Sequence, residues 1–372
     1  FFQNQLAQSD TSKKYLSKRG VDEKSIALFA IGFAPDSFNA LMDSIGTDDR
    51  RKALLEKTGM LSKSDNGRIY DKFRGRIMFP IFDRRGRVIA FGGRVLEKDD
   101  GPKYLNSPET PLFHKGRELY GLWQVKQAHN KIMRLIVVEG YMDVVSLFQH
   151  GITQAVATLG TATTPDHAEL LFRNSADVYF CFDGHKAGRA AASKAVESII
   201  PRMRDGRQAF FLFLPDGEDP DTIVKTEGAY GFEQRLQQAT SLSDYFFDEL
   251  SKNANLNNLE GRARLAETVK PYLAKIPDGA FRDLMQERLH QLSGVKHAIT
   301  ETEKPVAKGR SISLKRSLVR AIITLLMQNP RFGLSIQAPY AFELLEQPGV
   351  HLLIELLNMI HARPEITTAS LL

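Results

Sequence analysis

Between residues 134 and 215 the sequence alternates short apolar runs with helical segments, and this alternation constrains the fold more than any other feature. The apolar runs are RLIVVEG, QAVATLG, DVYFCFDG and QAFFLFLP, and a segment of helical character follows each of the first three. Thr164 and Pro165 have the residue types of a helix N-cap and first turn. This order predicts a parallel sheet with right-handed crossovers and helices on its faces.

Acidic residues follow three of the four expected strands, at the edge where open parallel sheets form their sites. Glu139 ends the first strand, with Asp143 one helical turn later; Asp183 ends the third, and Asp219 and Asp221 follow the fourth. At about 4 Å and an effective dielectric of about 20, two carboxylates repel by about 4 kcal/mol. A hard divalent cation relieves such repulsion, and Mg²⁺ is the leading candidate. Taken singly, these acids have the alternatives of turn residues, helix caps or a solvated loop.

The segment after Asp183 has features of a phosphate site. Lys186 and Arg189 lie in the first turns of the expected helix, where an anionic ligand would offset their unfavourable interaction with the helix dipole. Gly184 and Gly188 permit close approach of the backbone. The alternative for Gly188 is tight packing of the helix on the sheet.

Positive charge is concentrated in one stretch of the chain. The formal net charge is +6, and residues 68–117, with twelve Lys and Arg against six Asp and Glu, account for all of it. This concentration is typical of a surface that binds a polyanion, with a solvated basic face as the alternative. Lys72, Arg74 and Arg76 are spaced two apart, so an extended chain would present all three on one face.

The other segments differ in pattern. Residues 1–65 are predicted to be mainly helical, and the two apolar runs of IMFPIFDRRGRVIAFGGRVL predict a β-hairpin. Helices are expected from residue 219 to about 294, and a linker over 299–313. The amphipathic segments that follow, LKRSLVRAIITLLMQNP and GVHLLIELLNMIHA, are expected to pack on each other.

Composition excludes several classes of protein. No apolar run approaches the roughly 18 residues of a membrane span, and no signal peptide is visible. The single cysteine, Cys181, cannot form an internal disulfide, which is consistent with the cytoplasm, and no cluster has the spacing of a zinc site. Because the chain begins with Phe rather than Met, we expect it to be a fragment of a longer protein.

Several motifs resemble those of a known family. VVEGYMDVVSL, FDGHKAGRAAA and LPDGEDPD resemble the glutamate, paired-aspartate and trailing acidic motifs of Toprim domains. YDKFRGRIMFPI, GRVIAFGGR and PKYLNSPETPLFHKGRELYG resemble the block that precedes Toprim in bacterial primases of the DnaG type. The resemblance runs from about Ser12 to at least Ile276, and less strongly beyond. It is specific, since several long motifs occur in the family's order.

The resemblance implies an α/β fold (α+β overall), with a Toprim parallel sheet flanked by helices. Four parts are expected: a basic N-terminal α+β subdomain over 1–130, the Toprim catalytic subdomain over 131–216, a helical subdomain over 217–298, and a linker with the first helices of a helicase-binding domain over 299–372. The implied activity is that of a DNA-directed RNA polymerase that makes short primers on single-stranded DNA. The zinc-binding domain of the family is absent from this chain.

The resemblance also assigns roles to residues. Glu139, Asp143 and Asp183 are the expected catalytic residues, and the metal ligands for Mg²⁺ or Mn²⁺ are Glu139, Asp183, His185, Asp219 and Asp221. Nucleotide-binding residues are expected at Lys103, Tyr104, Asn106, Lys115, Lys186 and Arg189. DNA-binding residues are expected at Lys72, Arg74, Arg76 and Arg94. Tyr104 has the alternative of a packed aromatic. Template contacts of this kind go to phosphates and are largely independent of sequence.

The implied partners are single-stranded DNA, ribonucleoside triphosphates and, through the C-terminal region, the replicative helicase of the DnaB type. The single-stranded DNA-binding protein is a further candidate partner, no membrane is involved, and the fragment is expected to be monomeric. The location is the bacterial cytoplasm, at the replication fork. Because the chain stops at Leu372, we do not expect tight helicase binding.

His185 departs from the family pattern. The family has Asp-x-Asp where this chain has Asp183, Gly184 and His185. A neutral imidazole suits Mn²⁺ or Zn²⁺ better than Mg²⁺ and brings no negative charge. Reduced metal occupancy or an altered metal preference is expected. The alternatives are a species difference at a water-bridged ligand and a deliberate change that weakens the site.

Two other classes of function compete with the polymerase. One is another Toprim enzyme, a nuclease or topoisomerase, although a topoisomerase needs a domain with a tyrosine nucleophile, for which no segment matches. The other is a non-catalytic DNA-binding or mediator Toprim protein, consistent with the loss of a carboxylate at His185. Incorporation of labelled ribonucleotides on a single-stranded template separates these possibilities.

Overall fold

The computed structural model describes residues 1–96, 101–160, 162–184, 186–295, 318–343 and 349–367. It contains two compact units, residues 1–298 and 299–372. Within the described ranges, no helix combines the length and the hydropathy that a bilayer crossing requires. The predicted linker over 299–313 and His185 both lie outside the described residues.

The first unit contains a five-stranded sheet with the strand order β11-β10-β9-β7-β8. Its strands are β7 (Arg134–Val138), β8 (Ala155–Ala157), β9 (Asp177–Phe182), β10 (Gln208–Phe213) and β11 (Thr240–Ser241). The first four are mutually parallel, and the two-residue β11 pairs with β10 in the antiparallel sense. The parallel sheet predicted from the apolar runs is therefore confirmed.

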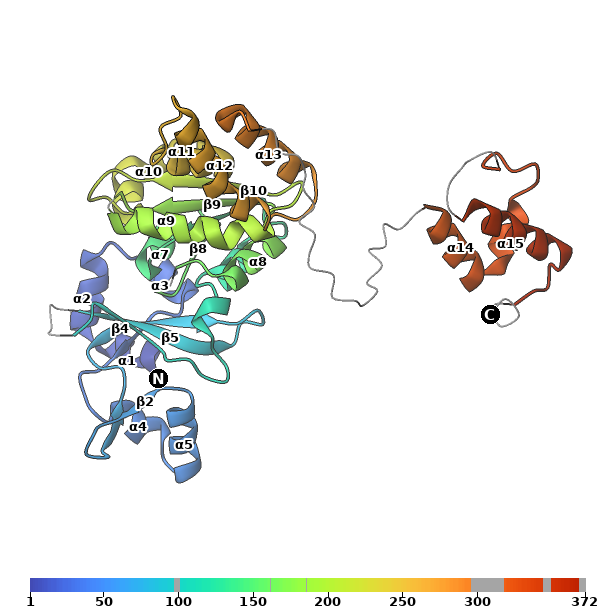
Figure 1. Ribbon diagram of the computed structural model, residues 1–372. Helices are drawn as coiled ribbons and strands as arrows, with labels where there is room; N and C mark the ends of the chain where they lie inside the picture. The colour runs from blue at the N-terminus through green and yellow to red at the C-terminus, as the bar shows by residue number, and fades with distance from the viewer. Residues whose placement is uncertain (97–100, 161, 185, 296–317, 344–348, 368–372) are drawn as a thin grey trace. The chain divides into compact units, whose positions relative to one another are not determined.

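Helices connect the parallel strands as the alternation predicts. They are α7 (Tyr141–Gln149), α8 (Pro165–Asn174) and α9 (Lys186–Ile199). The predicted cap of α8 is present, because the Thr164 side chain accepts a hydrogen bond from the His167 N–H and Pro165 lies in the first turn. Helices α8 and α9 cover the face of the sheet turned toward the viewer in Figure 1, whereas α7 packs against α10 (Pro220–Gln237).

The N-terminal part of the first unit is built around a four-stranded antiparallel sheet of order β1-β4-β5-β6. The strands are β1 (Gly32–Ala34), β4 (Arg76–Phe82), β5 (Val88–Val95) and β6 (Tyr104–Asn106). The predicted hairpin is the β4–β5 pair. The helices before it are α1 (Phe2–Gln8), α2 (Asp10–Lys18), α3 (Glu23–Leu28), α4 (Ala40–Ile45) and α5 (Asp49–Lys57), with a small β2–β3 pair (Leu61–Lys63 and Ile69–Asp71). The 3₁₀ helix η1 (Lys115–Arg117) and α6 (Leu122–Ala128) lead to β7.

The extended presentation expected for Lys72, Arg74 and Arg76 is wrong. The chain leaves β3 at Asp71, and Gly75 takes a φ of +59° before β4 begins, so the three residues do not share one strand. Arg76 is buried, and its Nη1 donates to the carbonyl oxygens of Gly93 and Pro102. The spacing of two failed as an indicator because a glycine turn interrupts the strand.

The remaining segments are helical, apart from β11. The first unit ends with α11 (Leu242–Ser251), α12 (Leu259–Leu273) and α13 (Ala280–Ser293). The second unit contains α14 (Leu318–Gln328), η3 (Pro330–Ser335) and α15 (Val350–Ala362). It has its own core, in which Val319 and Leu326 of α14 cluster with Leu353, Leu357 and Ile360 of α15. The expectation that these two helices pack on each other is confirmed.

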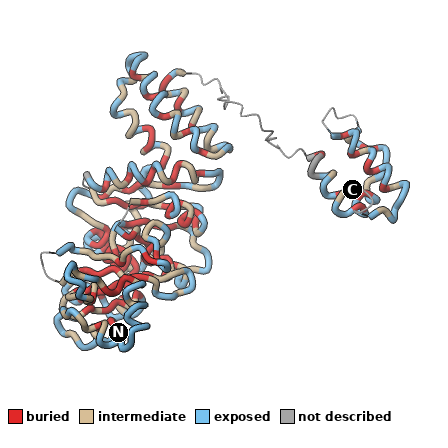
Figure 2. Tube along the Cα trace, turned by 60° about the horizontal axis from the view of Figure 1, so that its bottom comes forward, coloured by how far each residue is buried: buried red, intermediate tan, exposed pale blue. Residues whose placement is uncertain are grey.

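The five-stranded and the four-stranded sheet of the first unit both contribute to one large hydrophobic core. Figure 2 shows buried residues following the strands and the inner sides of the helices. Phe79 of β4 stacks on Tyr141 of α7 with 5.3 Å between ring centroids, and Tyr120 meets Tyr141 edge to face at 4.7 Å. Because such aromatic pairs bury large areas, they fix the antiparallel sheet against the start of α7.

Candidate active site

A cavity of about 280 Å³ lies at the carboxyl edge of the parallel sheet, between that sheet and the N-terminal part of the chain. We call it the carboxyl-edge pocket. Its lining combines acidic and basic side chains from both parts: Arg19, Arg94, Lys103, Tyr104, Asn106, Glu139, Gly140, Tyr141, Met142, Asp143, Gly160, Asp183, Asp219 and Asp221.

The five acids predicted from the strand ends all line this pocket. Glu139 follows β7, and Asp143 lies in the first turn of α7. Asp183 follows β9, whereas Asp219 is the N-cap of α10 and Asp221 lies in its first turn. They meet because the carboxyl ends of parallel strands share one edge of the sheet.

The crowding of these carboxylates is strongest at Asp143, which is 8% exposed. The pKa of Asp143 is raised to about 8, mainly by burial and in addition by the negative charges of Asp219, Asp183 and Asp221. The Gly140 N–H, which donates to Asp143 Oδ2 over 2.9 Å, opposes the shift. A pocket that disfavours its own ionised carboxylates in this way attracts a cation.

Three of the acids are nevertheless held by groups of the protein. Asp143 accepts the Gly140 N–H, Asp219 Oδ1 accepts the Thr222 N–H over 2.8 Å, and Asp221 Oδ1 lies 2.6 Å from Lys225 Nζ. In the part of the chain that the structure describes, no three His, Cys, Asp or Glu side chains are arranged to hold a metal ion. The oxygen donors suit a hard divalent cation. Each of these contacts uses one oxygen of its carboxylate, so the second oxygen remains available to a cation.

A buried arginine supports the opposite wall of the pocket. Arg94 is 5% exposed; its Nε donates to the Tyr15 hydroxyl over 2.7 Å and its Nη1 to the Tyr104 hydroxyl over 2.5 Å. Burial raises the pKa of Tyr104 to about 12, so the phenol stays protonated. Tyr104 is half-buried and also lines the pocket, and the exposed Lys103 lies beside its ring at 5.9 Å. The sequence left open whether Tyr104 packs as a core aromatic or lies at the nucleotide site. In the structure its ring is partly packed and also lines the pocket.

Asn106 ties the two parts of the pocket together. Its Oδ1 accepts a hydrogen bond from the Tyr141 hydroxyl over 2.8 Å, and its Nδ2 donates to the Leu159 carbonyl over 2.9 Å. Strand β6, which carries Asn106, belongs to the antiparallel sheet, whereas both partners belong to the segments around the parallel sheet. The width of the pocket is therefore set by direct hydrogen bonds.

The two glycines after Asp183 are required by the chain's own backbone. A Cβ at Gly184 would lie 2.3 Å from the Leu214 carbonyl oxygen, and one at Gly188 would lie 2.1 Å from that of Asp183. Real Cβ atoms do not approach this closely. For Gly188 the structure thus favours the alternative that the glycine allows α9 to pack tightly against the end of β9.

Several predicted basic residues lie elsewhere. The described lining of the pocket does not include Lys72, Arg74, Arg76, Lys115 or Arg189. Arg74 Nη1 donates to the Asp71 carbonyl, and its guanidinium lies over the Phe38 ring at 4.5 Å. Burial lowers the pKa of Lys72, and the charge of Lys115 lowers it further. Arg189 is exposed on α9; the backbone of Lys186 begins that helix.

Two functional candidates have no sequence signal. Arg19 follows α2 and lines the pocket, and Lys225 of α10 donates to the Arg19 carbonyl over 2.8 Å while it pairs with Asp221. The contact between Lys225 and Arg19 joins positions 206 residues apart, so no local motif could indicate it, whereas the pair with Asp221 spans one turn of α10. Lys225 thus connects an acid of the pocket to the N-terminal part.

The fully buried His167 supports the loop that carries Lys115, and it gives a pH prediction. Its Nε2 lies 2.9 Å from the Lys115 carbonyl oxygen, and burial lowers its pKa. Because the unfolded chain then binds a proton that the folded chain does not, stability should fall as the pH drops through about 6.5. Urea unfolding at several pH values measures this dependence, which His167→Gln should weaken. An unchanged dependence in that variant would contradict the assignment.

Four family models match the chain. "DNA primase catalytic core, N-terminal domain" matches residues 1–126, and "Toprim-like" matches 136–224. "DnaB-helicase binding domain of primase" matches 243–297, and "DNA primase DnaG DnaB-binding" matches 319–372. The third match falls on the segment for which the sequence predicted only a helical subdomain.

Known proteins resemble the chain over most of its length. It is 45% identical over 380 residues to the DNA primase of Escherichia coli (strain K12), a match that covers 100% of this chain and 65% of that protein. The solved E. coli primase catalytic core is 49% identical, with a TM-score of 0.77 and coverage of 80% of this chain and 96% of that one. A DnaG primase catalytic domain solved with bound single-stranded DNA is 50% identical, with a TM-score of 0.75 and coverage of 78% and 94%.

Proposed function

The chain belongs to the family of bacterial DnaG-type DNA primases, and we propose that it is a DNA-directed RNA polymerase that makes short RNA primers on single-stranded DNA. It spans about 65% of the length of the curated primases it matches. The observation that carries the proposal is the carboxyl-edge pocket, in which five acids face a wall with Arg19, Arg94 and Lys103. Phosphoryl transfer needs this pairing of carboxylates with phosphate-binding cations.

In the proposed reaction, the 3′-oxygen of one nucleotide attacks the α-phosphorus of a ribonucleoside triphosphate. The new O–P bond forms as the bond to the β-phosphate oxygen breaks, and pyrophosphate leaves. We assign Glu139 as acceptor of the 3′-hydroxyl proton, with Asp143 and Asp183 beside it. A divalent cation, Mg²⁺ or Mn²⁺, held by Glu139, Asp183, Asp219 and Asp221 would neutralise charge on the transferred phosphate.

The basic wall is assigned to the nucleotide and the template. We propose that Lys103, Tyr104 and Asn106 contact the incoming triphosphate, and their position in the lining of the same pocket as the acids supports this. We extend nucleotide binding to Lys115, Lys186 and Arg189, and DNA binding to Lys72, Arg74, Arg76 and Arg94. Since Arg76 and Arg94 are buried, we expect them to act by supporting the surface.

Primer synthesis tests the function directly. The chain, supplied with single-stranded DNA, labelled ribonucleoside triphosphates and Mg²⁺ or Mn²⁺, should release labelled RNA. Strand cleavage without incorporation would replace the proposal by a nuclease. Binding of DNA without either reaction would replace it by a non-catalytic mediator.

The residue at position 185 gives a metal prediction. His185→Asp restores the family's second carboxylate and its negative charge, so we expect primer synthesis to reach half its maximum at a lower Mg²⁺ concentration. The gain should be smaller with Mn²⁺, which accepts imidazole more readily than Mg²⁺ does. Titration of both ions in the incorporation assay measures this. Superimposable curves for the two proteins would refute the role of residue 185.

Partners and location follow from the family. We propose contact with a DnaB-type replicative helicase through the segments that match DnaB-binding models, at the replication fork in the bacterial cytoplasm. The single-stranded DNA-binding protein as a partner, the monomeric state, and zinc in a separate N-terminal domain stay predictions.

A further inference from the structure

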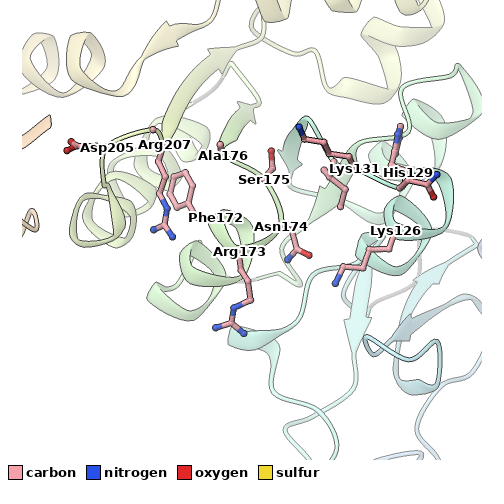
Figure 3. Close-up of a pocket in the computed structure, with 13 residues that line it drawn as sticks. Lys126, His129, Lys131, Phe172, Arg173, Asn174, Ser175, Ala176, Asp205 and Arg207 are labelled. Carbon is pink, nitrogen blue, oxygen red and sulfur yellow. The ribbon is translucent and has the colours of Figure 1, made fainter. Parts of the chain in front are cut away.

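A second, larger cavity lies at the opposite edge of the parallel sheet. We call it the amino-edge pocket. It has a volume of about 660 Å³ and is lined by the segments that precede β7, β9 and β10, together with the ends of α6 and α8 (Figure 3). The proposed reaction does not use this cavity, because the acids line the other edge.

The amino-edge pocket is strongly basic. Lys126, Lys131, Arg173 and Arg207 line it, against the single carboxylate of Asp205. In Figure 3 the side chains of Lys126, Arg173 and Arg207 extend from three different segments toward the same side of the view. The Asp205 carboxylate is already used, because its oxygens accept the N–H groups that begin α13 over 2.8 and 3.1 Å.

The cations of the pocket have few partners of opposite charge. Among the described residues, no carboxylate forms an ion pair with Lys126, Lys131 or Arg207. Arg173 has only a 3.8 Å contact with Glu169, and both side chains are exposed. This excess of positive charge in a concave surface favours an anionic ligand.

The arrangement of the cations indicates a chain of phosphates rather than one. Arg207 precedes β10, Arg173 ends the helix before β9, and Lys131 precedes β7, and these three strands are neighbours in that order. Three neighbouring strands span roughly 10 Å, so the backbone segments that carry these cations are spread over more than the width of one phosphate.

The aromatic residue of the pocket does not offer a stacking surface for bases. The guanidinium of Arg207 lies over the Phe172 ring at 5.0 Å, and Phe172 is buried. Single-stranded nucleic acids are usually held by cations together with exposed aromatic rings. Cations without a free ring indicate a contact to the backbone alone, with no preference for sequence.

We propose that the amino-edge pocket is a second contact for the phosphate backbone of single-stranded nucleic acid, used when the strand is long enough to reach both edges of the sheet. The proposal rests on the proposed function, which brings a strand to the carboxyl edge. Strand β9 has six residues, so the edges lie about 20 Å apart. A short oligonucleotide at the acids therefore cannot occupy both.

The test is the salt dependence of binding to long and short strands. Lys131→Glu combined with Arg173→Glu reverses two exposed charges of the pocket, and Arg264→Glu combined with Lys275→Glu makes the same change at exposed sites of the α12 region. Each phosphate contact contributes about 0.7 to the slope of log K against log salt. The first pair should lower that slope by about 1.4 for an oligonucleotide of about 30 nucleotides and leave it unchanged at about 3 nucleotides, which is too short to reach from one edge to the other. The control pair should leave the slope nearly unchanged for both the long and the short oligonucleotide.

The outcomes separate this proposal from the proposed function. Equal slopes for the two double variants on the long strand would overturn the proposal for the amino-edge pocket. A loss of affinity for free ribonucleoside triphosphates alone, with strand binding unchanged, would also overturn it. Parallel measurements on DNA and RNA identify the strand: a smaller slope with DNA alone assigns the template, and with RNA alone the product. If the wild-type chain makes no primer, the proposed function is wrong. The salt-dependence slopes still show whether the amino-edge pocket binds a strand. Matching melting curves show that the substitutions leave the fold intact.

Discussion

Replacing Glu139 by glutamine should reduce ribonucleotide incorporation by about 10²–10⁴-fold, the range that a positioned proton acceptor contributes. Glu139 is exposed at the end of β7 and lines the carboxyl-edge pocket. The amide keeps the size of the side chain but loses its charge and its capacity to accept a proton. Single-turnover incorporation with saturating nucleotide measures the chemical step apart from binding.

The binding of DNA should respond in the opposite sense to catalysis. Removal of one negative charge from the pocket lowers the repulsion of phosphates, so Glu139→Gln should bind single-stranded DNA as tightly as the wild type or more tightly. Glu287→Gln, at an exposed position on α13, is the matched control and should keep full activity. Incorporation within about threefold of the wild type in Glu139→Gln would remove the residue from the reaction.

Gly184→Ala should lower both stability and activity, although it changes no charge. The added Cβ would lie 2.3 Å from the Leu214 carbonyl oxygen and 2.6 Å from the Pro215 carbonyl carbon. Both neighbours are backbone, so relief requires the ends of β9 and β10 to separate. Overpacking of this kind costs about 1–3 kcal/mol. The movement also shifts Asp183 relative to Asp219, and a displacement near 1 Å can cost about 100-fold in rate.

The control for this prediction is Gly151→Ala. Gly151 has a φ of +89° with no atom within 4 Å of the built Cβ, so alanine there strains the backbone without displacing a neighbour. We expect a stability loss of about 1–2 kcal/mol from the left-handed conformation, with normal incorporation below the melting transition. Urea unfolding and incorporation at one temperature compare the two variants. Normal activity in Gly184→Ala would show that the contact between the strand ends does not position Asp183.

The fold was predictable where the sequence obeys strong general rules. Four apolar runs separated by helical segments leave few arrangements other than a parallel sheet, and the structure has that sheet. The same rule predicted that the acids would gather, because residues after parallel strands share one edge. The strand at Tyr104–Asn106 was not predicted, because it has three residues and forms only against β5.

The basic side of the site was harder to predict, because its geometry depends on distant contacts. Arg94 looked like a surface residue, but its guanidinium bonds to Tyr15, 79 positions away in the sequence. Arg76 is buried because the positive φ of Gly75 turns the chain just before β4, where Arg76 begins the strand. Charge counts locate a basic region, but they do not distinguish arginines that face solvent from those that brace the fold.

The hydrogen bonds of Asn106 have a consequence for how substrates enter. Tyr141 and Leu159 hold this side chain from the far part of the pocket, so the two walls form a preassembled gap rather than a pair of jaws. Because these hydrogen bonds link the two walls directly, we expect the separation of the walls to stay the same when a nucleotide binds. If the chain makes primers as proposed, we expect selection of the nucleotide to depend on its base pairing with the template inside a gap of constant width.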